Sequence, residues 1–337
     1  MTIALLLMFA FFLTVLGIVI FKKIASSIDR LRDIPNERSS HSTPVIRGAG
    51  IVIVTVTLIV YVASLGSAAN LAFVVTAASV ALIGFADDLY SLPSLPRLVV
   101  HASAAAILVL SGHRLAPVSF VMPGVEIDLG LVWQALAILF IVWMTNAFNF
   151  MDGIDGIAGS QGVAAGLGWV ILGLATDNHP ITVFGSLIVG TCAGFLLFNW
   201  EPASVFMGDA GSTFLGFTLA SASILTGSQA SISDSYAILA TVAFLWMFLF
   251  DTIFTRIKML ISGKAFWNPH REHLYQKLVI SGISHRTVTM FYFLCGVLIA
   301  ATAMFRAEIR SFLLPLTMVT CPTLLLLWAR KKEIDVT

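Results

Sequence analysis

The chain has 337 residues, of which 58% are hydrophobic and only 11% are charged. Charged residues make up about a quarter of an average soluble domain, so this composition excludes an ordinary soluble protein and indicates a polytopic, all-α membrane protein. The formal net charge of +1 gives no indication of nucleic-acid binding. The three cysteines, Cys192, Cys295 and Cys321, lie in apolar stretches without metal-ligand spacing, and we interpret them as buried thiols.

Eleven apolar stretches are candidates for membrane-spanning helices, which need about 20 mostly apolar residues each. They are residues 3–21, 48–66, 69–86, 98–111, 131–149, 157–175, 180–198, 212–228, 236–257, 287–305 and 311–329. The first has neither a basic segment before it nor a small-residue cleavage site after it, so we expect a retained helix rather than a signal peptide. Residues 113–130 predict a small periplasmic hairpin.

The distribution of Lys and Arg predicts the orientation of the chain. If the N-terminus is periplasmic and the helices alternate, all but three of the 19 Lys and Arg residues fall on the cytoplasmic side, as the positive-inside rule requires. The C-terminus is then cytoplasmic. The acidic clusters of the chain also fall on this side, which predicts one cytoplasmic cleft. No repeat or soluble domain interrupts the sequence, so residues 1–337 are expected to form a single domain.

The first acidic cluster is Asp87-Asp88, which ends the third predicted helix. Adjacent carboxylates on a helix point about 100° apart, so one can face a metal while the other faces a cation or the backbone. Pro93 and Pro96 are expected to end the helix. Solvated carboxylates at a helix end are the alternative, but carboxylates beside a bilayer are costly and usually functional.

The second cluster is Asn149-x-x-Asp152-Gly-x-Asp155-Gly, after the fifth predicted helix. The glycines indicate that the helix unwinds here and that the backbone approaches a ligand. Asn149, Asp152 and Asp155 are therefore candidates for binding ribose hydroxyls or a base, or for holding Mg²⁺ through water. A polar cap on the following helix is the alternative.

The third cluster, Phe206-x-Gly-Asp209-x-Gly-Ser, opens the eighth predicted helix. Backbone N–H groups at such a helix start favour an anion, and Asp209 beside them is suited to hold Mg²⁺ between two phosphates. Phe206 could stack on a flat base. A plain N-cap for Asp209 and ordinary packing for Phe206 are the alternatives.

The fourth cluster runs from Asp251 to His273 and includes His270-Arg271-Glu-His273 in a basic inside loop. No third or fourth zinc ligand of Cys or His type lies nearby, whereas Arg271 favours an anion such as phosphate. The lysines of this loop are interpreted as contacts with anionic membrane lipid. Arg47, in the first inside loop, is compatible with another phosphate or lipid-headgroup contact.

Together these four motifs resemble the polyprenyl-phosphate N-acetylhexosamine-1-phosphate transferases, a group within glycosyltransferase family 4 that includes WecA, MraY and WbpL-type enzymes. The resemblance covers roughly residues 33–285. It implies ten or eleven helices around a cytoplasmic cleft in the bacterial inner membrane. It also implies that undecaprenyl phosphate attacks the β-phosphorus of a UDP-N-acetyl sugar, which gives undecaprenyl-diphospho-sugar and UMP.

The resemblance further implies roles for single residues. Asp209 and Asp88 would bind Mg²⁺, with Mn²⁺ as the alternative ion. Asp87 and Asp88 are predicted to be catalytic on the lipid-phosphate side, where one of them would position or deprotonate the lipid phosphate. The predicted uridine side consists of Asn149, Asp152, Asp155 and Phe206. The diphosphate and sugar side consists of His270, Arg271 and His273, of which the two histidines are predicted to be catalytic. Arg47 is predicted to bind substrate.

The chain departs from MraY-type enzymes in its histidine segment. Those enzymes carry three consecutive histidines, whereas His270-Arg-Glu-His273 resembles the WbpL-type group. This disfavours a muramyl-pentapeptide substrate and favours N-acetylglucosamine, N-acetylgalactosamine or a 6-deoxy N-acetyl sugar, for O-antigen or a related surface glycan. The muramyl-pentapeptide reaction stays the first alternative, and a secondary transporter or a metal-free lipid-binding scaffold are alternatives from other classes. A homodimer is possible, and the sequence does not reveal whether the chain dimerises.

Overall fold

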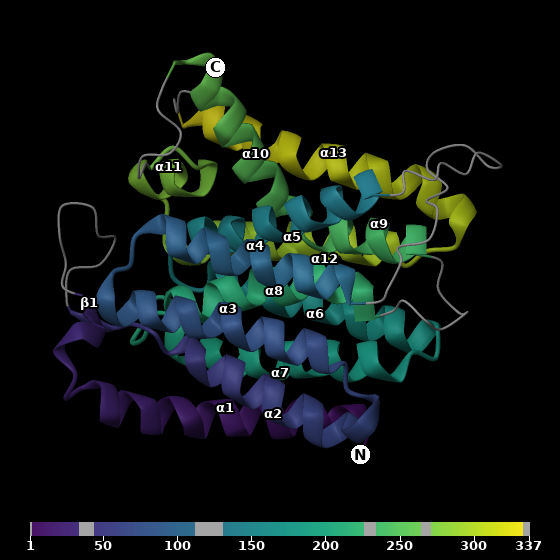
Figure 1. The fold of residues 1–337 in the computed structure, drawn as a ribbon. Helices are drawn as coiled ribbons and strands as arrows, with labels where there is room; N and C mark the ends of the chain where they lie inside the picture. Colours follow the sequence, from purple (N-terminus) through teal and green to yellow (C-terminus); the bar gives the residue numbers. More distant parts are fainter. Residues whose placement is uncertain (1, 34–43, 112–130, 226–233, 264–270, 333–337) are drawn as a thin grey trace.

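The computed structural model describes residues 2–33, 44–111, 131–225, 234–263 and 271–332. Within these ranges the chain is almost entirely helical (Figure 1). The predicted hairpin at 113–130 and the predicted site residue His270 lie outside the described residues.

The described residues form a series of helices along the chain. The first seven are α1 Ile3–Ala25, α2 Gly50–Leu65, α3 Leu71–Tyr90, α4 Ser94–Leu110, α5 Leu131–Met151, α6 Ile157–Ala175 and α7 His179–Asn199. The others are α8 Gly208–Leu225, α9 Asp234–Phe244, α10 Trp246–Ile261, α11 Leu274–Ile280, α12 His285–Ala303 and α13 Ala307–Lys331. As far as the described residues extend, all eleven predicted apolar stretches are therefore helical, with a break in the ninth, and α11 is a short additional helix in the segment between the ninth and tenth.

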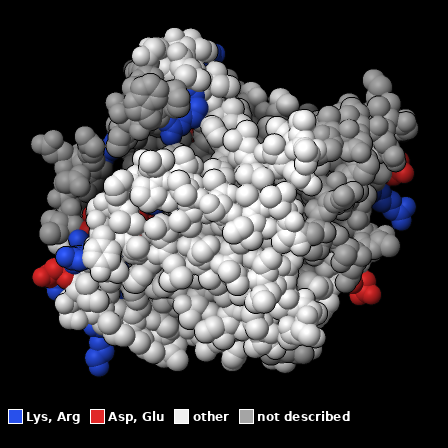
Figure 2. All heavy atoms as spheres, viewed as in Figure 1, with Lys and Arg blue, Asp and Glu red and all other residues white. Residues whose placement is uncertain are grey.

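The prediction of an all-α polytopic membrane protein is confirmed. Among the described residues, eight helices are long and apolar enough to cross a membrane, or nine if the bent pair α9–α10 counts as one span. Helix α4 is shorter than these, and α8, whose first turn carries Asp209, is outside this set although most of its side chains are buried. On the face seen in Figure 2, charged side chains gather at the ends of the helices and near α10, and a broad uncharged surface lies between them.

The ninth predicted helix is broken, which its sequence does not indicate. Helices α9 and α10 meet at Leu245 with a bend of 70°, although no Gly or Pro lies at the break. The next residue, Trp246, donates its indole N–H to the carbonyl of Met318 in α13, with an N–O distance of 2.7 Å. That carbonyl lacks its usual helical partner because Pro322, four residues later, has no N–H. The bend thus satisfies a backbone group that a proline in another helix leaves free.

Helix α8 is the element around which the site forms. Helices α2, α3 and α5 pack against it, and glycines let two of them approach its first turn closely. An added Cβ at Gly84 of α3 would lie 2.6 Å from the carbonyl oxygen of Asp209, and one at Gly50 of α2 would lie 2.4 Å from the Cα of Gly211. The inner end of α3 and the start of α8 are therefore in direct backbone contact.

Two very short strands bring the first inside loop to the same place. Strand β1, Arg32–Asp33, pairs antiparallel with β2, Val45–Ile46, and Ile46 forms a further parallel bridge with Val205. In Figure 1, β1 and α11 lie at the same end of the bundle, and the N-terminus lies at the opposite end. The chain before α2 is thus fastened beside the chain that leads into α8.

Candidate active site

The carboxylate of Asp88 caps the N-terminus of α8. Its Oδ1 accepts a hydrogen bond from the backbone N–H of Asp209 at 2.9 Å, and its Oδ2 accepts one from Ala210 at 3.2 Å. Gly208 precedes these residues with φ of +73°, and an added Cβ there would lie 2.6 Å from both carboxylate oxygens. A side chain from α3 thus satisfies the amides that the first turn of α8 leaves without helical partners.

Asp87 and Asp209 share one cation, and we call them the shared-cation pair. The Nη1 atom of Arg97 lies 2.8 Å from Asp87 Oδ2 and 2.6 Å from Asp209 Oδ2. The side chain of Asp87 is 14% exposed, that of Asp209 is 24% exposed and that of Arg97 is 25% exposed, so solvent reaches all three. The other oxygen of Asp87 accepts a hydrogen bond from the N–H of Leu92 at 2.5 Å, which fixes the turn between α3 and α4.

Arg47 stabilises the end of α3 from which both aspartates project. Its Nη2 donates to the carbonyl of Asp88 at 2.6 Å and to that of Asp87 at 3.4 Å. A cation at the C-terminus of a helix is favourable because the last carbonyls are unpaired and carry partial negative charge. The residue predicted to bind substrate therefore makes its described contacts with a helix end.

The segment after α5 reaches the same place. The amide of Asn149 donates to the hydroxyl of Ser212, in the first turn of α8, at 3.1 Å. Burial raises the pKa of Asp152 well above its ordinary value, and the negative charges of Asp209 and Asp88 raise it further. Asn149 thus contacts the first turn of α8, and Asp152 lies in the electrostatic field of the aspartates there.

Asp155 has different surroundings from Asp152. Its Oδ2 accepts a hydrogen bond from the N–H of Ala203 at 3.0 Å, and its Oδ1 lies 3.5 Å from Nδ1 of His285. Its carbonyl accepts from the hydroxyl of Thr289 at 2.8 Å. These contacts make Asp155 an anchor between the loop after α5, the loop before α8 and helix α12.

Phe206, the predicted base-stacking residue, is held through its backbone. Its N–H donates to the carbonyl of Ile46 at 2.8 Å, and its carbonyl accepts from Ala49 at 3.1 Å. These bonds continue the strand bridge next to Arg47. They fix the backbone of Phe206, from which the ring extends, two residues before the start of α8.

A second group of polar side chains surrounds Asp251 in α10, and we call Asp251, His273 and Tyr292 the buried network. The Asp251 carboxylate is fully buried and accepts from His273 Nδ1 at 3.2 Å and from the Tyr292 hydroxyl at 2.5 Å. It also accepts from the backbone N–H groups of Leu274 and Tyr275, at 3.0 and 3.3 Å. Asp251 therefore caps α11 and fixes the ring of His273 at the same time.

Tyr275 joins the buried network to the segment after α5. Its hydroxyl donates to the carbonyl of Phe150 at 2.8 Å, and an added Cβ at Gly153 would lie 2.2 Å from that hydroxyl oxygen. Burial, and then the charge of Asp251, raise the pKa of Tyr275 well above its ordinary value, so the hydroxyl stays protonated and can donate. Gly153 is thus required by the close approach of α11.

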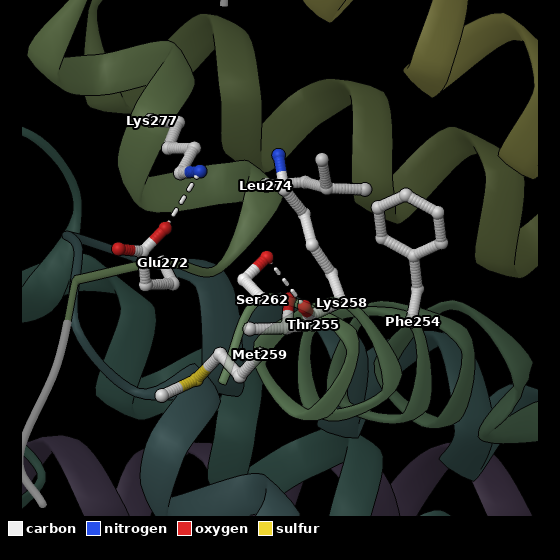
Figure 3. A pocket seen from close by; sticks show the side chains of 8 residues that line it. All are labelled: Phe254, Thr255, Lys258, Met259, Ser262, Glu272, Leu274 and Lys277. Atoms are coloured by element: carbon white, nitrogen blue, oxygen red, sulfur yellow. Dashed lines mark hydrogen bonds and ion pairs between the residues drawn. The ribbon is translucent and has the colours of Figure 1, made fainter. Parts of the chain in front are cut away.

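A small pocket between α10 and α11 lies beside the buried network and not at the shared-cation pair. Lys258 and Lys277 line it, and Lys277 forms an ion pair with Glu272 at 2.8 Å (Figure 3). Arg256, also on α10, stacks over the ring of Phe150 at 5.0 Å, and Arg271 is exposed. Four basic side chains therefore lie on α10, on α11 and just before α11, on the side of the buried network.

The structure brings five of the eleven predicted site residues together. Around the start of α8 lie Asp87, Asp88, Asn149, Asp152 and Asp209. His273 belongs instead to the buried network, next to the end of α5. Sequence reasoning missed Arg97, although a single arginine that opens an apolar stretch shortly after an acidic pair is a signal that could have identified it.

The donor set fits a Mg²⁺ ion that also uses substrate oxygens. In the described part of the chain, no three His, Cys, Asp or Glu side chains are arranged to hold a metal ion by themselves. Mg²⁺, however, is usually bound through one or two carboxylates together with substrate phosphates. Asp87 and Asp209 are two such carboxylates, and the guanidinium between them shows that a cation is stable there.

Fold and site together define an integral membrane enzyme with a carboxylate cluster at one end of its helices. The sequence model of glycosyl transferase family 4 matches residues 70–227. A decaprenyl-phosphate N-acetylglucosaminephosphotransferase of Mycobacterium leprae is 30% identical over 77% of this chain and 73% of its own length. The chain belongs to glycosyl transferase family 4 and is a phosphotransferase.

Two further relatives show how far along the chain the similarity extends. A probable undecaprenyl-phosphate N-acetylglucosaminyl 1-phosphate transferase of Bacillus subtilis is 29% identical over 86% of this chain and 81% of its own length. A phospho-N-acetylmuramoyl-pentapeptide-transferase of Oceanobacillus iheyensis is 42% identical, but over 31% of this chain and 33% of its own. Similarity to the first kind of relative extends over most of the chain, and similarity to the second is confined to a third of it.

Proposed function

We propose that this protein transfers an N-acetylhexosamine 1-phosphate from a UDP-sugar to undecaprenyl phosphate, which releases UMP. An oxygen of the lipid phosphate attacks the β-phosphorus, and the bond from that phosphorus to the oxygen bridging the two phosphates breaks. The bond between the sugar and its phosphate is untouched, so the anomeric configuration is retained. The names of the relatives that cover most of the chain favour N-acetylglucosamine as the sugar.

The observation that carries this proposal is the shared-cation pair at the start of α8. Phosphoryl transfer depends on alignment and on neutralisation of charge, and carboxylates that share a cation at the end of a helix bundle are suited to both. Asp87 and Asp209 would hold Mg²⁺, or Mn²⁺ in its place, which would neutralise phosphate oxygens. This assignment replaces Asp88 by Asp87 in the predicted pair of ligands, because both Asp88 oxygens bind amides of α8.

The other residues act through position and charge. Asp88 holds the first turn of α8, and with it Asp209, at a fixed place beside α3. Asn149 and Asp152 border the pair on the side of α5, where the nucleotide would bind. A phosphate monoester is already largely dianionic at pH 7, since its second pKa is about 6, so the lipid phosphate needs no general base to react.

The location of the site completes the proposal. The cluster faces the cytoplasm of a bacterial inner membrane, with the N-terminus in the periplasm, because that orientation puts nearly all Lys and Arg inside. The polyprenyl chain then stays in the bilayer while its phosphate meets a cytoplasmic nucleotide sugar. Such a product begins a surface glycan, for which O-antigen is our first candidate.

The test is UMP release from purified protein in lipid nanodiscs that contain undecaprenyl phosphate. The donors are UDP-N-acetylglucosamine, UDP-N-acetylgalactosamine, a 6-deoxy N-acetyl analogue and UDP-N-acetylmuramyl-pentapeptide, each with Mg²⁺ and with a chelator. We expect UMP from the first donor, only with Mg²⁺ and only when the lipid is present. Release from the muramyl donor alone would replace the proposed substrate, and no release from any donor would overturn the proposed reaction.

A further inference from the structure

Arg97 interacts with the shared-cation pair in an unusual way. Arginine usually grips a carboxylate with two parallel N–H groups, but here a single nitrogen, Nη1, contacts one oxygen of Asp87 and one of Asp209. The Nε of Arg97 is buried and has no hydrogen-bond partner. A buried donor without a partner costs free energy. The guanidinium therefore does not make all the hydrogen bonds that it could make in a more favourable arrangement.

The surroundings of Arg97 on α4 also leave polar atoms without partners. His101, one helical turn later, is 2% exposed, and neither of its ring nitrogens has a hydrogen-bond partner. This stretch of α4 therefore does not fix the guanidinium through hydrogen bonds of its own. Among the described residues, the Arg97 side chain makes its hydrogen bonds with the two carboxylates.

The charge balance explains why the guanidinium stays between the carboxylates. One nitrogen of Arg97 lies within 2.8 Å of a carboxylate oxygen of both Asp87 and Asp209, so the two carboxylates are close together and, without a cation, their negative charges would repel each other. Arg97 supplies one positive charge to the two negative ones. A divalent cation supplies two charges at the same carboxylates, and it leaves the guanidinium free to meet the phosphate that arrives with the metal.

The geometry points to Arg97 as the internal counter-cation of the shared-cation pair, which competes with the divalent metal for Asp87 and Asp209. Without metal it neutralises the two carboxylates and keeps them together. When metal binds, the guanidinium leaves this position and turns toward the anionic substrate. This inference rests on the proposed function for the metal, but it concerns metal affinity and not the reaction itself.

Metal binding by the full-length protein tests this directly, without nucleotide. The probe is Mn²⁺ alone, titrated into wild type, Arg97→Gln, Arg97→Lys and the control Arg286→Gln, with free Mn²⁺ measured by electron paramagnetic resonance. Arg286 is a suitable control because its described contacts are with Glu201 and not with the pair. We expect Arg97→Gln to bind Mn²⁺ about tenfold more tightly than wild type, since close charge pairs couple at least that strongly.

The other variants separate competition from a structural role. Arg97→Lys keeps a competing charge and should bind Mn²⁺ less tightly than Arg97→Gln, and Arg286→Gln should match wild type. The turnover of Arg97→Gln should fall while its metal affinity rises, a combination that a merely damaged site does not produce. Unchanged or weaker Mn²⁺ binding by Arg97→Gln would overturn the inference, and UMP release by wild type would then leave the proposed function intact.

A measurement on wild type covers the case in which Arg97→Gln does not fold. Phenylglyoxal modifies exposed arginines, and mass spectrometry reports the extent of modification at each site. Saturating Mg²⁺ should increase labelling of Arg97 and leave labelling of Arg286 unchanged. Labelling of Arg97 that does not respond to Mg²⁺ would contradict its release from the pair.

Discussion

Asp209 and Asp251 are both aspartates of the site region, but their carboxylates have very different partners. Asp251 accepts from His273, Tyr292 and the N–H groups that open α11, and it is fully buried. A carboxylate has about four acceptor sites, so that group is saturated. Asp209 instead shares one nitrogen of Arg97 with Asp87 and is partly exposed. The comparison separates carboxylates that hold the fold from carboxylates that are available to a metal and a substrate.

The largest effect is expected when a member of the shared-cation pair loses its charge. Asp209→Asn should reduce UMP release on the order of 10³-fold, because the amide no longer neutralises a cation at the reacting phosphates. The melting temperature should stay close to that of wild type, because the Asp209 side chain caps no helix. Glu201→Gln, which removes another acidic side chain at the loop before α8, serves as the control and should keep its activity.

A substitution in the buried network should instead reduce the stability of the protein. Asp251→Ala should lower the free energy of unfolding by about 3–5 kcal/mol, since it leaves buried partners of one carboxylate without an acceptor. All three cysteines are buried, so a thiol-reactive dye reports unfolding directly. Asp251→Asn, which keeps one acceptor, should melt between Asp251→Ala and wild type. An unchanged melting temperature for Asp251→Ala would remove the distinction between the two regions.

A third test concerns the cap that Asp88 provides. Gly208→Ala forces a Cβ to within 2.6 Å of the Asp88 carboxylate at a φ of +73°. Gly263 has a similar φ of +66° but no atom within 4 Å of the added Cβ, so Gly263→Ala controls for backbone strain alone. We expect a loss of about 2–3 kcal/mol for the first variant and about 1 kcal/mol for the second. Equal losses would show that the Asp88 contact contributes nothing.

The smallest effect is expected at the junction between α5 and α11. Gly153→Ala meets the Tyr275 hydroxyl and should cost about 1–2 kcal/mol in stability. Tyr275→Phe removes that hydroxyl, so the double variant should recover part of the loss. A double-mutant cycle of melting curves measures this coupling. If the two losses simply add, Tyr275 is not the group that requires glycine at position 153.

The sequence predicts the helices well because each apolar stretch carries its own signal. It does not predict the bend at Leu245, where the next residue, Trp246, donates to a carbonyl of Met318 that Pro322 leaves free in a different helix. Local residues govern the length of a helix, whereas its partners, far away in the chain, govern its bends.

The sequence likewise predicts the local part of the candidate site, which is the position of its residues along the helices. It does not predict which distant residues contact them. The motifs place the aspartates at helix ends, but they do not reveal that Asp88 caps α8 while Asp87 shares Arg97 with Asp209. The side chains of adjacent residues on one helix point in different directions. Which partner each side chain meets depends on where α4 and α8 pack, and the motif does not contain that information. The partners of Asp251 and Tyr275 likewise come from three different helices and leave no local pattern.

The most direct test of the account follows the two phosphorus atoms of the donor. UDP-N-acetylglucosamine labelled with ³²P at either the α or the β position is incubated with the protein, Mg²⁺ and undecaprenyl phosphate. We predict that the β label moves into the lipid fraction and the α label leaves as UMP, and that Asp209→Asn does neither. If both labels stay together in released UDP, the sugar alone is transferred, and the account of phosphoryl transfer at the shared-cation pair is wrong.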